Sequence, residues 1–200
     1  MPQATSADLS QITLRVEATP NPATMKFCFS QAVVDAPIDF SSALEAESSP
    51  LASKIFGFPW TSSVFLGPDF MSVTKQDWVD WDYLAEPLSG LIRDHLSQNI
   101  PVYVELASTS APADSDSNAV QAGDTDLVQR IKRAIDREIR PIVAYDGGDV
   151  HFAKMTEDGV LHVKFKGACA GCPSKSVTLK EGIEVRLKEI FPEIQAVVGI

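Results

Sequence analysis

Cysteine is scarce in this 200-residue chain, which has only three, Cys28, Cys169 and Cys172. So small and odd a count does not describe the disulfide framework of a secreted protein. The first residues also have no basic segment followed by an apolar one, as a secretory signal would. We therefore expect a cytoplasmic protein of bacterial type, and a mature mitochondrial form would have the same features. In such a reducing compartment, a Cys-x-x-Cys pair is more often metal-binding or catalytic than a disulfide.

Long apolar runs and positive charge are also lacking. No apolar run approaches the roughly 20 residues that span a bilayer, so we expect no membrane partner. The chain has 17 Lys and Arg against 27 Asp and Glu, a net charge of −10. Nucleic acid is a poor candidate partner, because neutralising phosphate needs basic residues. The sequence has no nucleophile elbow, phosphate loop or paired-carboxylate motif, and we expect that the protein is not an enzyme.

A polar segment divides the chain into two parts. Residues 107–123, "ASTSAPADSDSNAVQAG", contain one large aliphatic residue, Val120. Such a segment buries too little apolar surface to offset the entropy of ordering it, so we expect a flexible linker. It separates an N-terminal domain, residues 11–106, from a C-terminal domain, residues 124–200. We predict two small α+β domains.

Alternating apolar residues and turn signals predict the elements of the N-terminal domain. Strands are expected at 12–19, 24–30, 62–75 (as a hairpin) and 100–106, and helices at 49–57 and about 77–98. Ser49 is the expected N-cap of the first helix. Cys28, between two phenylalanines, is expected to be a buried core residue. The tryptophans are also expected to belong to the core, namely Trp60, Trp78 and Trp81.

The C-terminal domain is predicted in the order α-β-β-(CxxC loop)-α-β. A helix begins at Asp124 or Thr125, and Pro141 ends or kinks it. Two glycines, Gly147 and Gly148, form a turn, in which the flanking aspartates Asp146 and Asp149 are expected to serve as turn residues. A hairpin, the cysteine loop, a helix over about 174–191 and an edge strand over 194–200 follow.

Cys169 and Cys172 lie in "GACAGCPSKS", a loop of small residues before a helix. The positive end of that helix and the nearby lysines favour thiolate, the form of cysteine that binds metal. Structural zinc and common iron–sulfur clusters take four protein ligands, and this domain offers two cysteines. A second copy of the loop, related by a two-fold axis, would complete such a site. A thiol–disulfide redox pair is the alternative, and zinc would bind such a thiolate pair in vitro.

The C-terminal domain resembles the NifU-like (Nfu-type) iron–sulfur scaffold family in two stretches. These are "IRPIVAYDGGDV", residues 139–150, and "GACAGCPSKS", residues 167–176. The N-terminal domain resembles the Nfu-type N-terminal domain through "ATPNPATMKF" and "SPLASKIFGFPWTSSVFLGPDFMSVTK". The resemblance implies a scaffold or carrier that holds a labile [4Fe–4S] cluster between two protomers and passes it from a donor to apo-proteins. Cys169 and Cys172 fall on the family's cluster cysteines.

Overall fold

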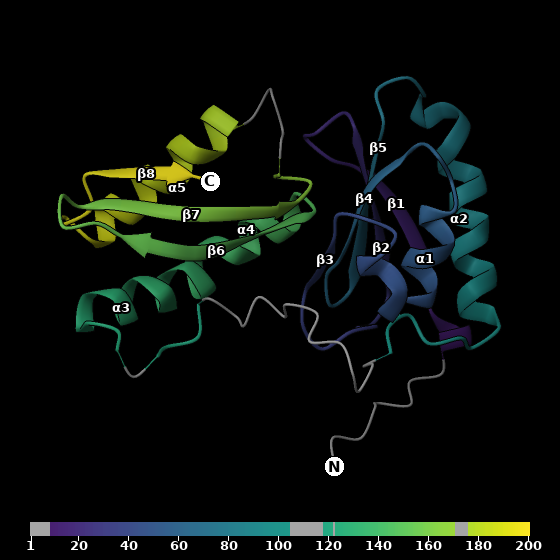
Figure 1. Cartoon of the computed structure of the whole chain (residues 1–200), viewed down its shortest axis with the longest axis horizontal. Coiled ribbons are helices and arrows are strands. Elements are labelled where there is room, and N and C mark those ends of the chain that lie inside the picture. The colour runs from purple at the N-terminus through teal and green to yellow at the C-terminus, as the bar shows by residue number, and fades with distance from the viewer. Residues whose placement is uncertain (1–8, 105–117, 122, 171–175) are drawn as a thin grey trace, which may run out of the picture. The chain divides into compact units, whose positions relative to one another are not determined.

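The computed structural model describes residues 9–104, 118–121, 123–170 and 176–200, without the side chains of 176–180. The chain divides into two compact units, Met1–Thr109 and Ser110–Ile200. Each unit combines its own sheet with helices (Figure 1), which confirms the predicted α+β class with two domains. The domain bounds 11–106 and 124–200 stay predictions. Of the predicted linker, residues 107–117 and 122 lie outside the described residues.

The N-terminal unit is an antiparallel sheet of five strands in the order β1-β2-β5-β4-β3, with two α-helices against one face. The strands are β1 (Leu14–Ala18), β2 (Thr24–Phe29), β3 (Ile38–Phe40), β4 (Thr61–Leu66) and β5 (Phe70–Lys75). The helices are α1 (Pro50–Phe56) and α2 (Trp81–Ser97), and two short 3-10 turns are η1 (Leu9–Gln11) and η2 (Glu45–Ser48). Figure 1 shows α1 and α2 on the same side of the sheet.

Ser49 caps α1, as the sequence predicts. Its hydroxyl oxygen accepts a hydrogen bond from the Ala52 N–H at 3.1 Å and donates to the Val102 carbonyl at 2.6 Å. The second bond fixes the segment that was predicted as a strand over 100–106. Within the part of that segment that the structure describes, 100–104, there is no strand. The prediction is wrong because this segment bonds to the start of α1, with the Val104 N–H on the Ser48 carbonyl at 2.8 Å.

The two faces of β2 differ in character. Phe27 and Phe29 belong to the core beneath the helices, whereas Cys28 points to the other face and is half-buried. The Cys28 thiol donates to Glu17 Oε2 at 3.4 Å. Cys28 is therefore not the core residue that the sequence predicts, because strand alternation places it opposite its aromatic neighbours. The prediction for the tryptophans is correct for Trp60 and Trp81 and wrong for Trp78, which is 68% exposed.

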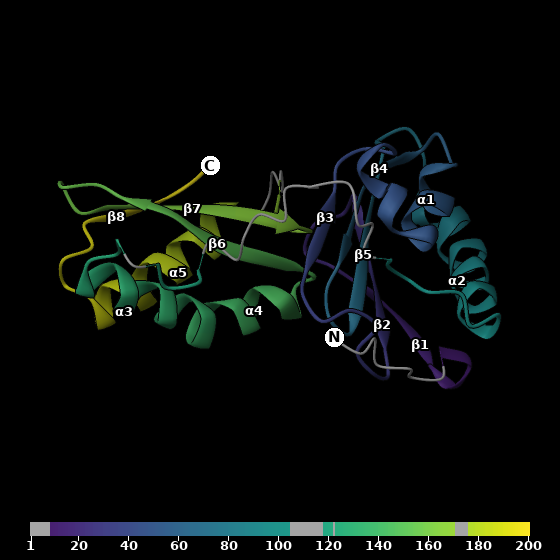
Figure 2. The same cartoon turned by 60° about the horizontal axis from the view of Figure 1, so that its bottom comes forward.

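The C-terminal unit has a three-stranded sheet with all its helices on one face (Figure 2). Its elements are α3 (Asp126–Ala134), η3 (Ile135–Ile139), α4 (Arg140–Tyr145), β6 (Gly148–Met155), β7 (Val160–Gly167), α5 (Ser176–Ile190) and β8 (Ala196–Gly199). β6 pairs antiparallel with β7, and β8 runs parallel to β7 after the α5 crossover. The order of elements is the predicted one.

The predicted first helix of this unit continues past Pro141 because a π-helical segment, η3, joins α3 to α4. Thr125 caps α3 by accepting from the Val128 N–H at 3.3 Å, in agreement with the prediction. Pro141 falls in the first turn of α4, directly after η3. The proline thus follows a change in helix geometry rather than an end of the helix.

The last residues of the predicted linker that the structure describes pack on the C-terminal unit. Asn118 is 2% exposed, and its side chain bonds the backbone of β6. The Lys132 ammonium donates to the Ala119 carbonyl at 3.1 Å and to Asp124 Oδ2 at 2.8 Å. One buried amide and one buried ammonium therefore hold Asn118 and Ala119 against the C-terminal unit, although both residues fall within the predicted linker.

Candidate functional site

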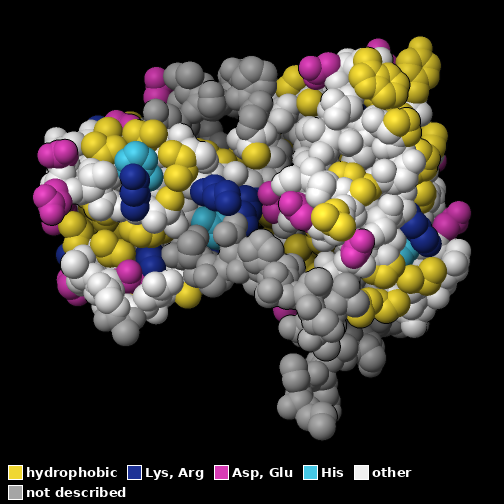
Figure 3. Space-filling model, in the orientation of Figure 1, with side chains coloured by type: hydrophobic (Ala, Val, Ile, Leu, Met, Phe, Trp, Pro, Cys, Tyr) yellow, Lys and Arg dark blue, Asp and Glu magenta, His cyan; other side chains and the backbone are white. Residues whose placement is uncertain are grey.

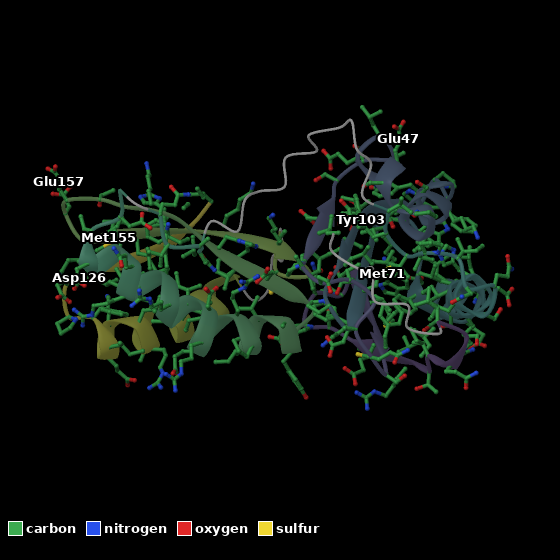
Figure 4. All side chains as sticks on the ribbon, turned by 90° about the horizontal axis from the view of Figure 1, so that it is seen from below. Glu47, Met71, Tyr103, Asp126, Met155 and Glu157 are labelled. Carbon is green, nitrogen blue, oxygen red and sulfur yellow. The ribbon has the colours of Figure 1, made fainter. Side chains whose placement is uncertain are left out.

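Cys169 lies in a tight turn at one end of the β6–β7 hairpin. Glu157, in the turn between β6 and β7, lies at one end of the unit (Figure 4). The register pairs Gly148 with Gly167, so the cysteine turn is at the other end of the strands. The Ala170 N–H donates to the Gly167 carbonyl at 3.0 Å and closes the turn around Cys169.

The two glycines at the start of β6, Gly147 just before the strand and Gly148 as its first residue, serve different purposes. Gly147 has φ +84°, a backbone conformation that residues with a Cβ rarely adopt, and its carbonyl accepts from the Ala168 N–H at 3.1 Å. Gly148 has no positive φ, but a Cβ there would lie 2.7 Å from Cys169 Sγ and 2.6 Å from the Lys166 carbonyl oxygen. Gly147 therefore makes the turn, and Gly148 leaves the space in which the Cys169 sulfur sits.

Asp149 follows Gly148 and is the centre of a buried ion pair. Arg140 donates to it through Nε at 2.8 Å and through Nη2 at 2.9 Å, and His151 Nε2 lies 2.9 Å from its Oδ2. Burial of the Asp149 carboxyl raises its pKa, but the bonds from His151 and Arg140 outweigh this and lower the pKa to about 2. The prediction that Asp149 is a turn residue is wrong, since its carboxylate joins β6 to α4.

Basic residues of β7 lie opposite polar residues of β6 in the strand register. Lys166 pairs across the strands with Asp149, and Lys164 pairs with His151. Figure 3 shows lysine, arginine and histidine side chains gathered on this unit.

The structure places one of the two predicted ligands. Cys169 is half-buried and packs against the core of the C-terminal unit. Cys172 lies outside the described residues, as does Pro173 after it. Cys28 lies in the other unit, where burial and the neighbouring Glu17 raise the pKa of its thiol despite the opposing charge of Lys26. A protonated thiol is a poor metal ligand, and the structure therefore favours no ligand role for Cys28.

Sequence reasoning did not find the polar residues that support the site, Asn118, Arg140, Asp149 and His151. For Arg140 and Asp149 a signal was present, since opposite charges flank the Gly-Gly turn within ten residues. Asn118 gives no such signal, because it is one polar residue in a polar segment. Among the described residues, no group of three or more His, Cys, Asp or Glu side chains is arranged to hold a metal ion.

The fold and the cysteine turn define a NifU-like domain that follows a second, separate α+β unit. Two family models match the chain accordingly. "NifU-like domain" matches residues 131–198, and "Scaffold protein Nfu/NifU N terminal" matches residues 14–99. The matched segments include every β-strand of the described parts of both units, apart from the last residue of β8.

Curated relatives are similar along most of the chain. "NifU-like protein 5, mitochondrial" of Arabidopsis thaliana is 37% identical over 92% of this chain and 66% of its own length. "NFU1 iron-sulfur cluster scaffold homolog, mitochondrial" of Homo sapiens is 37% identical over 92% of this chain and 70% of its own. The chain spans about two thirds of the length of these relatives. It belongs to the Nfu/NifU-like family.

Solved structures of smaller proteins are also similar. The solution structure of a NifU-like protein from Saccharomyces cerevisiae covers 53% of this chain and 94% of its own, with 24% identity and a TM-score of 0.43. The crystal structure of protein SAV1430 from Staphylococcus aureus covers 40% of this chain and 95% of its own, with 23% identity and a TM-score of 0.35. No helix in the described ranges is long and apolar enough to cross a bilayer.

Proposed function

We propose that the protein is a non-enzymatic iron–sulfur cluster scaffold or carrier. Its C-terminal unit would bind a labile [4Fe–4S] cluster through Cys169 and Cys172 of two chains. The observation that carries this proposal is the Cys169 sulfur, which sits beside Gly148 at the end of the β6–β7 hairpin. The family and the names of the relatives support it, since the human relative is called an iron–sulfur cluster scaffold.

The number of ligands implies that two chains share one cluster. A [4Fe–4S] cluster takes four thiolates, and each chain contributes two. When a cluster bridges two copies, each chain supplies two of its four bonds, whereas an enclosed cluster takes all four from one chain. Fewer bonds to each chain suit a protein that gives its cluster away. The partners are therefore a second copy of the chain, a cluster donor and apo-proteins that receive the cluster.

Transfer would proceed by ligand exchange without a change in oxidation state. A recipient's cysteine thiol loses its proton and forms a new iron–sulfur bond, while the bond from iron to Cys169 or Cys172 breaks and that thiolate takes up a proton. Repeating the exchange at each of the four bonds moves the whole cluster. The N-terminal unit would serve in recognising the partners. Cytoplasmic localisation stays a prediction, and both relatives described above are named as mitochondrial.

Anaerobic reconstitution with iron and sulfide tests the proposal. We expect a brown dimer with about two irons per chain, because one four-iron cluster is shared by two chains. Cys169→Ser and Cys172→Ser should each abolish cluster binding. Cys28→Ser is the matched control and should retain it, because Cys28 lies in the other unit. A colourless monomer that catalyses disulfide reduction would instead support the redox alternative and overturn the carrier proposal.

A further inference from the structure

A chain of hydrogen bonds with buried residues at both ends begins at Asn118, in the segment that precedes α3. The Asn118 side-chain oxygen accepts from the Phe152 N–H at 2.6 Å, and its Nδ2 donates to the Val150 carbonyl at 3.3 Å. One amide thus bonds two residues of β6 that are two apart, as a neighbouring strand would. The same Nδ2 donates to Asp136 Oδ1 at 2.8 Å.

The chain continues from Asp136 through Arg140 to Asp149. Asp136 Oδ1 also accepts from Arg140 Nη1 at 3.0 Å, so a single oxygen joins Asn118 to the guanidinium. Arg140 uses its Nε and Nη2 for the bidentate pair with Asp149. A bidentate pair fixes both the position and the plane of the carboxylate. We call these four residues, Asn118, Asp136, Arg140 and Asp149, the polar relay.

The far end of the polar relay lies one residue from Gly148, against which the proposed cluster ligand sits. Asp149 follows Gly148, and Cys169 Sγ lies 2.7 Å from the position of a Cβ on Gly148. The Asp149 side chain also accepts from the Val150 N–H at 2.8 Å, which ties the carboxylate to the backbone of the same strand. The relay therefore holds the start of β6, which is the surface on which the Cys169 sulfur rests.

We propose that the polar relay positions Cys169 for cluster binding, and that Asn118 makes the end of the interdomain segment part of the cluster-binding unit. This inference rests on the proposed function. Asn118 is 2% exposed and Asp149 is 4% exposed, so breaking the relay would leave polar groups buried without partners. The start of β6 then opens more often, and the Cys169 turn loses its support. Asn118 and Asp136 act as positioning residues, since neither touches the proposed cluster.

Alkylation of the apo full-length chain tests the positioning without any cluster. The rate at Cys169 is followed by peptide mass spectrometry, with Cys28 as the internal reference. Asn118→Ala and Asp136→Ala should each raise the Cys169 rate about five- to tenfold, the change expected when a buried hydrogen bond is lost. Asp136→Asn should stay within about twofold of the wild type, because its side-chain oxygen can still accept from both Asn118 and Arg140.

A matched variant separates positioning from general loss of stability. Val197→Ala truncates a core residue in β8, which pairs with Leu161 near the other end of β7. At a comparable loss of Tm, it should leave the Cys169 alkylation rate unchanged. The proposal that the polar relay positions Cys169 would be overturned by equal Cys169 alkylation rates in Asn118→Ala and the wild type. An equal rise of that rate in Val197→Ala would overturn it as well.

Cluster retention provides the second measurement. In reconstituted full-length protein, Asn118→Ala and Asp136→Ala should lose cluster absorbance about five- to tenfold faster than the wild type. Asp136→Asn should again be close to the wild type. An unchanged rate of cluster loss in both alanine variants would contradict the relay's role in cluster binding. If the wild-type chain takes up no cluster, the proposed function fails, and the alkylation experiment still decides whether the relay positions Cys169.

Discussion

The sulfur of Cys169 occupies the space that a side chain on Gly148 would need, 2.7 Å from the Cβ position. Gly148 is in β6 and Cys169 follows β7, so the two strands meet where the proposed ligand sits. Substitution at Gly148 therefore affects the proposed ligand directly. The same substitution also crowds the Lys166 carbonyl, which belongs to the backbone and cannot rotate away.

We expect Gly148→Ala to displace Cys169 and to lower the free energy of unfolding by about 1–3 kcal/mol, as overpacking does. Reconstitution should then give less cluster per chain than in the wild type. The control is Gly182→Ala in α5, where a Cβ meets nothing within 4 Å. That variant should gain up to about 1 kcal/mol from helix propensity and keep its cluster. Full cluster occupancy in Gly148→Ala would contradict the inference that a Cβ at this position displaces the Cys169 sulfur.

The depressed pKa of Asp149 predicts how stability depends on acid. The pKa falls from 3.8 to about 2 on folding, so the charged carboxylate stabilises the fold above about pH 4. That contribution, about 2 kcal/mol, is lost as pH falls through about 2. Denaturant titrations between pH 5 and pH 2 should show this loss in the wild type and not in Asp149→Asn. Asp158→Asn, in the exposed hairpin turn, should retain the wild-type dependence.

Ser49 joins the start of α1 to the segment that follows α2. It is fully buried, so Ser49→Ala would leave the Ala52 N–H and the Val102 carbonyl without this partner. We expect a loss of about 1–3 kcal/mol in the free energy of unfolding of the N-terminal unit. Ser97→Ala, which removes one exposed hydroxyl that bonds the Asp94 carbonyl, should change it by less than about 0.5 kcal/mol. Equal effects of the two variants would refute the buried role of Ser49.

Two tryptophans three residues apart should respond differently to truncation. Trp81 contacts Phe27 and Trp60 edge-to-face, at centroid distances of 6.5 and 6.4 Å. Trp81→Ala should therefore lower the free energy of unfolding by about 3 kcal/mol. Trp78→Ala should change it by less than about 0.5 kcal/mol, since Trp78 is 68% exposed. Chemical denaturation of both variants decides the matter, and a large loss in Trp78→Ala would show that its ring is packed.

The predictions from sequence succeed where structure is local and fail where it depends on distant contacts. The hairpins, the caps at Ser49 and Thr125 and the order of elements in the C-terminal unit rest on neighbouring residues. β3 was not predicted because its three residues, Ile38–Phe40, are too few to form a pattern. The segment after α2 looks like a strand, but it bonds to Ser49, 53 positions before Val102.

The same distinction between local and distant contacts applies to the candidate site. Cys169 could be identified from its spacing to Cys172 and from the small residues around both. Its support could not, because Asn118 reaches Phe152 across 34 positions and Arg140 reaches Asp149 across nine. Burial converts these polar residues from ordinary surface groups into a network, and burial of a polar residue has no local signal in a single sequence.

The π-helical segment η3 explains the spacing of the apolar residues in the continuous helix formed by α3, η3 and α4. Four core residues, Ile131, Ile135, Ile139 and Val143, are spaced by four and are at most 1% exposed. In a regular α-helix a repeat of four drifts by about 40° at each step, so Val143 would lie about 120° around the axis from Ile131. The wider turn of η3 advances each residue through a smaller angle and keeps all four toward the sheet. Four apolar residues spaced by four on both sides of a proline thus indicate a non-α turn, and relatives that lack one residue there should form a plain α-helix.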